Sequence, residues 1–260
     1  MNTTRNNLNE TALQLMAIRG GARCDTFNPE RDRFNLGYCV DTRVRDGLNA
    51  NRIAINQRHL AIASQYPFAH QLEAHFQMLV ENRTPVLVVL ASLTDMQNNE
   101  LPDYFSQAAT FGRIQTQSAL HSTEALGDGI EAHHYQLTVA GYDATIEIPV
   151  IHVHNWPDHQ TISPAATANL VTLIENITRD KIAFYESRRS RAVHESTKLL
   201  PVIHCRAGVG RTGQTIAAMA MRQDPNLPLH VITHDLRASR NDTMIQTPSQ
   251  METLLKMANA

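Results

Sequence analysis

The stretch from Leu200 to Gln214 constrains this chain more than any other part of its sequence. It contains an apolar run, a cysteine, a glycine-containing loop and an arginine, and it leads into an apolar helix predicted over residues 215–221. A loop that closes at a helix N-terminus directs several backbone N–H groups at one point, where the helix dipole adds partial positive charge. The stretch therefore predicts a cradle for an anion.

The same field acts on Cys205, which begins the loop. A positive environment favours a thiolate, so we expect the pKa of Cys205 to lie below the free-cysteine value of about 8.5. A thiolate beside a bound oxyanion is a candidate nucleophile. Thr212 places a hydroxyl near the sulfur, where it can stabilise the thiolate as a leaving group.

Arg211 and the loop backbone complete the predicted cradle. The planar guanidinium of Arg211 can hold two oxygens of a phosphate side by side. Gly208 and Gly210 are expected to let the backbone approach the ligand, because they carry no Cβ. A buried structural cysteine is the simpler alternative for Cys205, but it does not explain where the glycines and the arginine fall. The residues predicted to contact the anion through the loop are Arg206, Ala207, Gly208, Val209 and Gly210.

Composition bounds the architecture and the partners. The 260 residues are 42% hydrophobic, enough for one large α/β domain or two small ones, and the absence of repeats favours one domain over residues 1–260. A net charge of −2 gives no basic excess that would indicate nucleic-acid binding. No apolar run approaches a membrane span, and the polar start lacks a signal-peptide core. The cysteines Cys24, Cys39 and Cys205 are too few for a disulfide framework and indicate a reducing compartment.

Hydrophobic periodicity predicts the surrounding elements. Residues 1–30 form a polar segment with a short helix over 11–18. The apolar run 85–90 predicts a buried central strand, and residues 110–155 alternate as in a β-rich stretch. The basic stretch 188–191 is expected to be a solvated connection. Further helices are predicted over 68–83, after Ser163-Pro164, over 229–240 and after Pro248.

Asp95 follows the predicted central strand, at the end where active sites of open sheets gather. An acid at this place can pair with Arg211 and hold its guanidinium in position. Glu100 is a less favoured alternative partner, and a solvated loop acid is the other interpretation of Asp95.

A second candidate segment is Trp156-Pro157-Asp158. Proline stiffens the turn, and Trp156, the only tryptophan, can anchor a hinge, so Asp158 would lie on a mobile flap. His152 and His154 alternate on the preceding strand. No further ligands stand at suitable spacing, so no metal site is predicted.

Phe34 lies in a predicted loop near the N-terminus. It could line a ligand pocket. A single aromatic residue in a loop is more often a core anchor, and both interpretations stay open.

The segment from His204 to Gly213 resembles the phosphate-binding signature of the cysteine-based protein tyrosine phosphatases, in which five residues separate the cysteine from the arginine. The resemblance covers nearly the whole chain. It is closest to the catalytic domain of secreted effector phosphatases of the Yersinia outer-protein type. The chain departs from that pattern at Asp95, where glutamate is usual, at Arg52, where tyrosine is common, and at Gly213, where the effector has alanine. Other segments that resemble the effectors are 48–51, 65–67, 81–86, 102–105, 127–130 and 155–158.

The resemblance implies the phosphatase fold, an α/β architecture with a central twisted mixed β-sheet flanked by helices. It also implies that Cys205 attacks phosphorus, that Arg211 holds the phosphate oxygens and that Asp158 protonates the leaving phenol. Neither a metal nor another cofactor is needed. The remaining residues implied are Thr212 beside the sulfur, Gln246 and Gln250 as holders of the hydrolytic water, Phe34 at the substrate, and His204, Trp156 and Asp95 as supports.

The effector resemblance further implies secretion by the type III route into the host cell cytoplasm. The partners would be phosphotyrosine-containing host proteins, with a secretion chaperone as a further candidate and no nucleic acid or membrane. The route needs no cleaved signal peptide, which is compatible with the polar N-terminus. The chain is expected to be a monomer.

Three other activities fit the same cradle. A phosphoinositide phosphatase would tend to carry lysines inside the loop, where this chain has Ala207 and Val209. A dual-specificity phosphatase would use the same nucleophile. A non-catalytic phosphotyrosine-binding module would not require Cys205, Arg211 and Asp158 together.

Overall fold

The computed structural model describes residues 2–142, 145–188 and 199–260. The strands are β1 Ala50–Ile55, β2 Arg58–Ser64, β3 Leu87–Val89, β4 Ala109–Phe111, β5 Ile114–Gly127, β6 Ile130–Ala140, β7 Ile146–Val153 and β8 Val202–His204. The helices are α1 Asn2–Met16, η1 Ala69–Gln71 (a 3₁₀ turn), α2 Leu72–Glu81, α3 Leu93–Asn98, α4 Pro164–Ser187, α5 Gly210–Gln223, α6 Leu229–Ser239 and α7 Pro248–Ala258. None of the described helices combines the length and the apolar character that crossing a bilayer requires.

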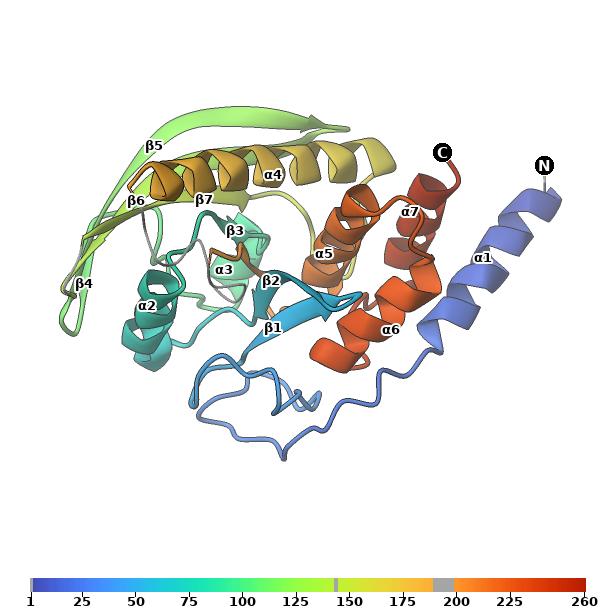
Figure 1. The fold of residues 1–260 in the computed structure, drawn as a ribbon, viewed down its shortest axis with the longest axis horizontal. Helices are drawn as coiled ribbons and strands as arrows, with labels where there is room; N and C mark the ends of the chain where they lie inside the picture. Colours follow the sequence, from blue (N-terminus) through green and yellow to red (C-terminus); the bar gives the residue numbers. More distant parts are fainter. Residues whose placement is uncertain (1, 143–144, 189–198) are drawn as a thin grey trace.

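The strands form one mixed sheet in the order β1-β2-β8-β3-β7-β6-β5-β4 (Figure 1). The four central strands β2, β8, β3 and β7 run parallel to one another, and the outer pairs are antiparallel. Parallel strands buried on both faces are expected to be continuously apolar, as β3 is. The predicted class, an α/β fold with a mixed sheet flanked by helices, is confirmed.

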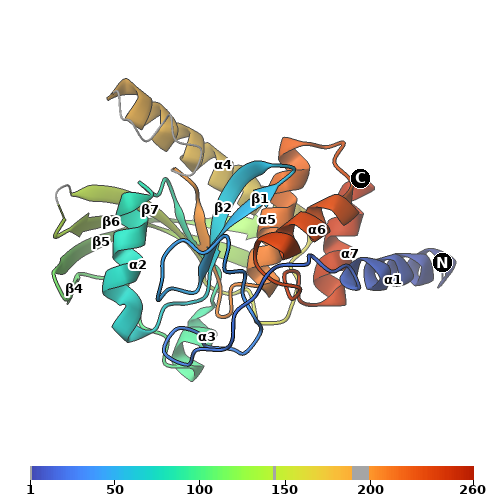
Figure 2. The same ribbon diagram turned by 60° about the horizontal axis from the view of Figure 1, so that its bottom comes forward.

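Two apolar layers cover the two faces of the sheet. Val88 of β3 packs in the cluster that contains α1, α4, α5, α6 and α7, whereas Leu87 and Val89 pack in the cluster that contains α2 (Figures 1 and 2). This alternation follows from the two-residue period of a strand. The carboxyl ends of β3 and β8 therefore lie between two packed layers, and the chain can place polar groups there with little freedom to move.

Most predicted elements are present. The strand expected over 85–90 is β3, the β-rich stretch supplies β4 to β7, and the helices expected over 68–83 and 229–240 are η1 with α2, and α6. Ser163 caps α4 as predicted, with its Oγ accepting from the N–H of Ala166 (3.1 Å). Of the basic stretch 188–191, all but the first residue lies outside the described residues.

The N-terminal helix differs from its prediction. It begins at Asn2 rather than residue 11 and ends at Met16. Leu8, Ala12 and Leu15 recur at helical spacing and pack in the same cluster as the apolar residues of α7. The polar run before Leu8 hides the start of the helix, because its sequence has no apolar face of its own.

Candidate active site

The cradle begins where β8 ends. Cys205 follows His204 directly, and the loop 205–209 then leads into α5, which starts at Gly210 rather than at residue 215. Arg211 and Thr212 therefore stand in the first helical turn. The cysteine is 2% exposed, and β8 lies between β2 and β3 in the middle of the sheet. The strand fixes the sulfur, and the helix presents its N-terminus to the same place.

Two donors contact the sulfur of Cys205. The hydroxyl of Thr212 and the backbone N–H of Gly208 each donate to Sγ at 3.3 Å. Burial by itself raises the pKa of Cys205, but the charge of Arg211 and the hydrogen bonds from Thr212 outweigh it, so the pKa lies below its ordinary value. The carboxylate of Asp158 acts in the opposite direction. The net effect favours the thiolate, as the sequence predicts.

The loop glycines are also constrained by the protein packed around them. Gly208 has φ of +72°, and a Cβ there would lie 2.0 Å from the carbonyl oxygen of Ser64. A Cβ on Gly210 would lie 2.9 Å from Oε1 of Gln246. Gly208 needs to be glycine because of its positive φ and its close packing against β2, and the space beside Gly210 is limited by the side chain of Gln246. The expectation that both glycines allow close approach to a ligand stays a prediction.

Arg240 holds the outer side of the loop, and sequence reasoning missed it. Its guanidinium is fully buried and donates to the carbonyl oxygens of Gly208 (2.8 Å) and Ala207 (3.0 Å). Because a peptide unit is planar and trans, each carbonyl that faces Arg240 turns the N–H of the following residue toward the cradle. Asn49 and Asn51 fix Arg240 in turn, at 2.8 and 2.7 Å.

Arg211 is 1% exposed and its donors are divided between two sides. Nη1 donates to Asp95 Oδ2 (2.5 Å), to the carbonyl oxygen of Trp156 (2.9 Å) and to that of Leu90 (3.2 Å). Nη2 donates to Asp158 Oδ1 (2.9 Å). Nε is buried with no hydrogen-bond partner among the described residues. The edge formed by Nε and Nη2 is the one that can accept an oxyanion.

Asp95 lies on α3, where the sequence suggested a loop. Ser92 and Asp95 form a reciprocal cap: the N–H of Ser92 donates to Asp95 Oδ2 (2.9 Å) and the N–H of Asp95 donates to Ser92 Oγ (3.0 Å). The carboxylate that binds Arg211 is thus fixed by its own helix. The alternative partner, Glu100, is exposed.

The segment with Trp156 folds over the same guanidinium. Trp156 is fully buried, and its Nε1–H donates to the carbonyl oxygen of Gln160 (2.8 Å). The side chain of Asp158 is 28% exposed, and His159 follows with φ of +61°. His159 Nε2 lies 3.6 Å from Asp158 Oδ2. The mobility of this flap stays a prediction.

Gln246 and Gln250 lie beside Gly210 but in different surroundings. Gln250 is fully buried; its Oε1 accepts from the N–H groups of Gln246 and Thr247, and its Nε2 donates to the carbonyl oxygen of Gln160. The side chain therefore caps α7 and ties it to the flap, which the sequence did not reveal. Gln246 is half-buried.

His204 precedes Cys205 directly, and Phe34 lies beside Arg206, the residue that follows Cys205. His204 is fully buried, with Nε2 2.6 Å from Tyr104 Oη and Nδ1 3.0 Å from the carbonyl oxygen of Cys205. Burial lowers the pKa of His204 to about 4, so the ring is neutral at ordinary pH. Phe34 is half-buried, and the guanidinium of Arg206 lies 5.1 Å from the centre of its ring. Phe34 thus stands at the loop and not in the apolar core.

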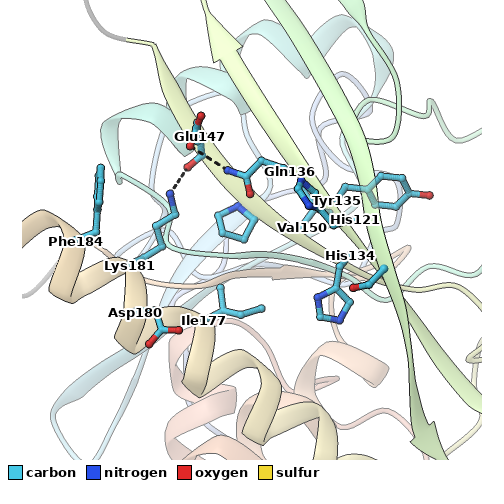
Figure 3. A pocket seen from close by; sticks show the side chains of 12 residues that line it. His121, His134, Tyr135, Gln136, Glu147, Val150, Ile177, Asp180, Lys181 and Phe184 are labelled. Carbon is cyan, nitrogen blue, oxygen red and sulfur yellow. Dashed lines mark hydrogen bonds between the residues drawn. The ribbon is translucent and has the colours of Figure 1, made fainter.

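The strand residue His152 and one separate cavity lie outside the cradle. In the described ranges no three His, Cys, Asp or Glu side chains are grouped to hold a metal, and His152 Nε2 bonds the carbonyl oxygen of Ala91. A cavity of about 450 Å³, here called the α4 groove, opens between α4 and the strands β5, β6 and β7 (Figure 3). The α4 groove shares no residue with the cradle; its lining includes His121, Gln136, Glu147, Asp180, Lys181 and Phe184.

Comparison with known families decides the relationship. A family model described as protein-tyrosine phosphatase matches residues 28–259. The chain belongs to the protein-tyrosine phosphatase family. The match includes Cys205, Arg211 and Asp158, and it leaves α1 outside.

Relatives within the protein-tyrosine phosphatase family are bacterial and eukaryotic. The chain is 46% identical over 245 residues to the tyrosine-protein phosphatase YopH of Yersinia pseudotuberculosis, covering 92% of this chain and 51% of that one. It is 35% identical over 222 residues to the secreted effector protein SptP of Salmonella paratyphi A, covering 84% and 39%. The chain thus spans about half the length, or less, of these curated relatives. A solved structure of PTPN18 in complex with HER2-pY1196 phosphopeptides shares the fold, with a TM-score of 0.69 at 20% identity over 91% of this chain and 84% of that one.

Proposed function

We propose that this chain hydrolyses phosphotyrosine in proteins through a phosphocysteine intermediate. The observation that carries the proposal is the convergence on one spot of the Cys205 sulfur, the Nε–Nη2 edge of Arg211 and the carboxyl group of Asp158. A lowered thiol pKa, a bidentate cation and a nearby proton donor are what attack on a phosphate monoester requires. Membership of the family supports the same assignment.

The first step joins sulfur to phosphorus. Cys205 Sγ attacks the phosphorus, the bond from phosphorus to the phenol oxygen breaks, and Asp158 gives its proton to that oxygen. Arg211 and the loop N–H groups hold the three other oxygens as their charge shifts. Asp95 supports this step because it fixes Nη1 and leaves the other edge of Arg211 for the phosphate.

The second step returns the enzyme to its starting state. Asp158, now a carboxylate, takes a proton from water, whose oxygen attacks phosphorus while the sulfur–phosphorus bond breaks. Thr212 donates to the departing thiolate. Gln246 is the better candidate to hold this water, because the Oε1 of Gln250 already accepts two backbone hydrogen bonds.

A turnover assay tests the proposal against its alternatives. Phosphotyrosine peptide, phosphoserine peptide and a phosphoinositide are offered to the same preparation, with Cys205→Ser as the control for contaminating activity. We expect hydrolysis of the phosphotyrosine peptide and little of the other two, unaffected by a chelator. Faster hydrolysis of the phosphoinositide would favour the lipid phosphatase, comparable rates on both peptides would favour a dual-specificity enzyme, and binding without turnover would favour a recognition module.

We also propose that the chain acts inside a host cell after type III secretion and that its partners are phosphotyrosine-containing host proteins. The support is its sequence identity to YopH (46%) and to SptP (35%), the latter described as a secreted effector. A reporter fused to the full-length protein, followed from bacterium to host cytoplasm, tests delivery. Loss of transfer in a strain without the secretion apparatus is the expected result, and unchanged transfer would contradict it.

We infer that residues 1–260 act as a single catalytic domain and a monomer. The support is the apolar cluster that joins α1 to the body of the sheet, since Ala12 and Leu15 pack in it. Sedimentation should give one species of the 29.1 kDa chain mass. A concentration-dependent dimer would overturn this part.

A further inference from the structure

Cys24 and Cys39 lie opposite each other where two parts of the N-terminal segment run antiparallel. The N–H of Val40 donates to the carbonyl oxygen of Arg23 (2.9 Å), so the residue after Cys39 bonds the residue before Cys24. That pattern marks the two cysteines as a non-hydrogen-bonded pair, whose Cα atoms come to about 4.5 Å and whose side chains share one face. A disulfide spans Cα separations of about 4.4–6.8 Å. The backbone therefore already has the geometry of a cross-linked pair.

The side chain of Cys24 faces the partner segment. A Cβ on Gly37 would lie 3.4 Å from Cys24 Cβ and 3.7 Å from its Sγ. Gly37 stands two residues before Cys39, on the same side of an extended chain. The Cys24 thiol donates only a weak hydrogen bond, to the carbonyl oxygen of Ala22 (3.6 Å). Rotation about one side-chain bond exchanges this contact for one with Cys39.

The two thiols differ in exposure. Cys24 is exposed, whereas Cys39 is 2% exposed. The backbone of Cys39 is fixed on both sides, since its N–H donates to the carbonyl oxygen of Arg240 (2.8 Å) and its own carbonyl accepts from Asn51 Nδ2 (2.8 Å). A reagent from solvent thus meets Cys24 first, and Cys39 is held in place as the second thiol.

We propose that Cys24 and Cys39 form a redox modification site, at which a peroxide converts the two thiols into an intramolecular disulfide. The Cys24 thiolate attacks the peroxide, the O–O bond breaks, and a sulfenic acid and hydroxide form. The sulfur of Cys39 then attacks the sulfenic sulfur, the S–O bond breaks, and the oxygen leaves as water with the proton of the thiol. In sum, two thiols and one hydrogen peroxide give one disulfide and two waters.

The cross-link closes the loop of residues 24–39, which carries Phe34 beside the cradle. A closed loop has fewer conformations in the unfolded chain, so the oxidised protein should unfold at a higher temperature. Burial, and to a smaller extent the neighbouring Cys39, raise the pKa of Cys24, so oxidation should be faster at pH 8 than at pH 6. Neither cysteine belongs to the cradle, so the inference does not depend on the proposed function.

Peroxide treatment of Cys205→Ser tests the site without interference from the third cysteine. This variant holds two of the three cysteines of the chain. Thiols titrated in denaturant should fall from two to zero per chain, the chain should stay monomeric on a non-reducing gel, and dithiothreitol should restore both thiols. Trypsin cuts after Arg23, Arg31, Arg33 and Arg43, so mass spectrometry should find peptide 24–31 joined to peptide 34–43.

Thermal unfolding measures the consequence of the cross-link. The midpoint of Cys205→Ser should rise by roughly 5–10 °C on oxidation. In the matched variant Cys205→Ser with Cys24→Ser, peroxide should leave the thiol of Cys39 free in the folded protein and the midpoint unchanged.

Three results would overturn the inference: sulfinic acid on Cys24 with Cys39 still reduced, a disulfide between two chains, or a cross-linked protein whose midpoint is unchanged or lower. Each would leave the proposed function intact, because turnover is measured separately. If serine at residue 205 disturbs folding, the same peptide map of the oxidised wild type decides whether Cys24 and Cys39 are joined.

Discussion

The cradle and the α4 groove both bring polar side chains together, but they are built differently. In the groove, Lys181 Nζ donates to the carbonyl oxygen of Glu147 (3.0 Å) and Gln136 Nε2 donates to Glu147 Oε2 (3.3 Å), so these polar groups bond one another (Figure 3). In the cradle, the donors converge on the sulfur of Cys205 and are fixed from behind by Asp95 and Arg240. Convergent donors held in place mark a site better than volume does.

Substitution of Cys205, the proposed nucleophile, should have the largest effect on turnover and so separate the cradle most clearly from the α4 groove. Cys205→Ser should lower turnover of a phosphotyrosine peptide by roughly 10⁵-fold or more, as expected when a covalent nucleophile is removed. Binding of the peptide should survive, because the Arg211 and backbone donors remain. A turnover assay measures the first effect, and calorimetry measures peptide binding. Cys24→Ser, at an exposed cysteine, is the matched control. Near wild-type turnover would remove Cys205 from its role.

The next effect concerns the flap. Asp158→Ala should reduce turnover by roughly 10²- to 10⁴-fold, the range for one positioned proton donor. In the wild type, a plot of kcat/KM against pH should be bell-shaped, and its decline at high pH should be absent in the variant. The loss of turnover should be smaller for substrates whose phenol is acidic enough to leave without a proton. Asp180→Ala, in the α4 groove, is the control and should leave the profile unchanged. If Asp158→Ala kept the full bell-shaped pH profile, Asp158 would be only a turn residue and not the proton donor.

The third prediction tests whether the backbone of the cradle loop must be held in place by Arg240. Arg240→Lys removes the fork that binds the carbonyls of Ala207 and Gly208, so kcat/KM should fall about 10- to 10²-fold as the loop amides lose their aim. Arg222→Lys is the control: this arginine lies in the last turn of α5, at the end far from the cradle, and donates to the carbonyl oxygen of Ala168 on α4. Equal losses of kcat/KM in the two variants would break the argument for Arg240.

A smaller effect is expected for the partner of Arg211. Asp95→Ala should weaken sulfate binding and lower the free energy of unfolding by about 1–3 kcal/mol, because a buried guanidinium loses an acceptor and α3 loses its reciprocal cap. Glu100→Ala, at an exposed position nearby, should change neither by more than about 0.5 kcal/mol. Denaturant unfolding and calorimetry measure both, and the reverse ranking would reassign the pair to Glu100.

The smallest effect belongs to the α4 groove. Lys181→Ala should leave kcat/KM within about twofold of wild type, since the amine serves only neighbouring groups in the described part of the chain. Thermal unfolding should show a modest change from the lost contact with Phe184. A large loss of activity would show that the groove, and not the cradle alone, takes part in the reaction.

Local patterns were enough for the elements and for the residues that face the cradle. The spacing from Cys205 to Arg211 predicted the cradle, the apolar run at 85–90 predicted β3, and Ser163-Pro164 predicted the start of α4. These features are fixed by neighbours in the sequence. The start of α1 could not be predicted in this way, because that helix is stabilised by packing against α7, which is distant in the sequence.

The supports of the site could not be predicted in this way. Arg240 acts on backbone carbonyls, which leave no trace in side-chain spacing. A side chain at Gly208 would collide with the backbone of Ser64, a contact that the local sequence cannot indicate. Gln250 looked like a water-binding residue and proved to be a helix cap as well. In each case a contact between distant segments decided the role.

The contacts of Arg240 also determine when the cradle can be assembled during synthesis. Arg240 is 191 residues beyond Asn49 and 189 beyond Asn51, and it acts on a loop that precedes it by about thirty. A nascent chain that has just released the signature 204–213 from the ribosome holds the nucleophile but not the residue that orients its amides. Long-range contacts of this kind form late. The cradle can therefore be complete only after residue 240 has been translated and has joined the fold.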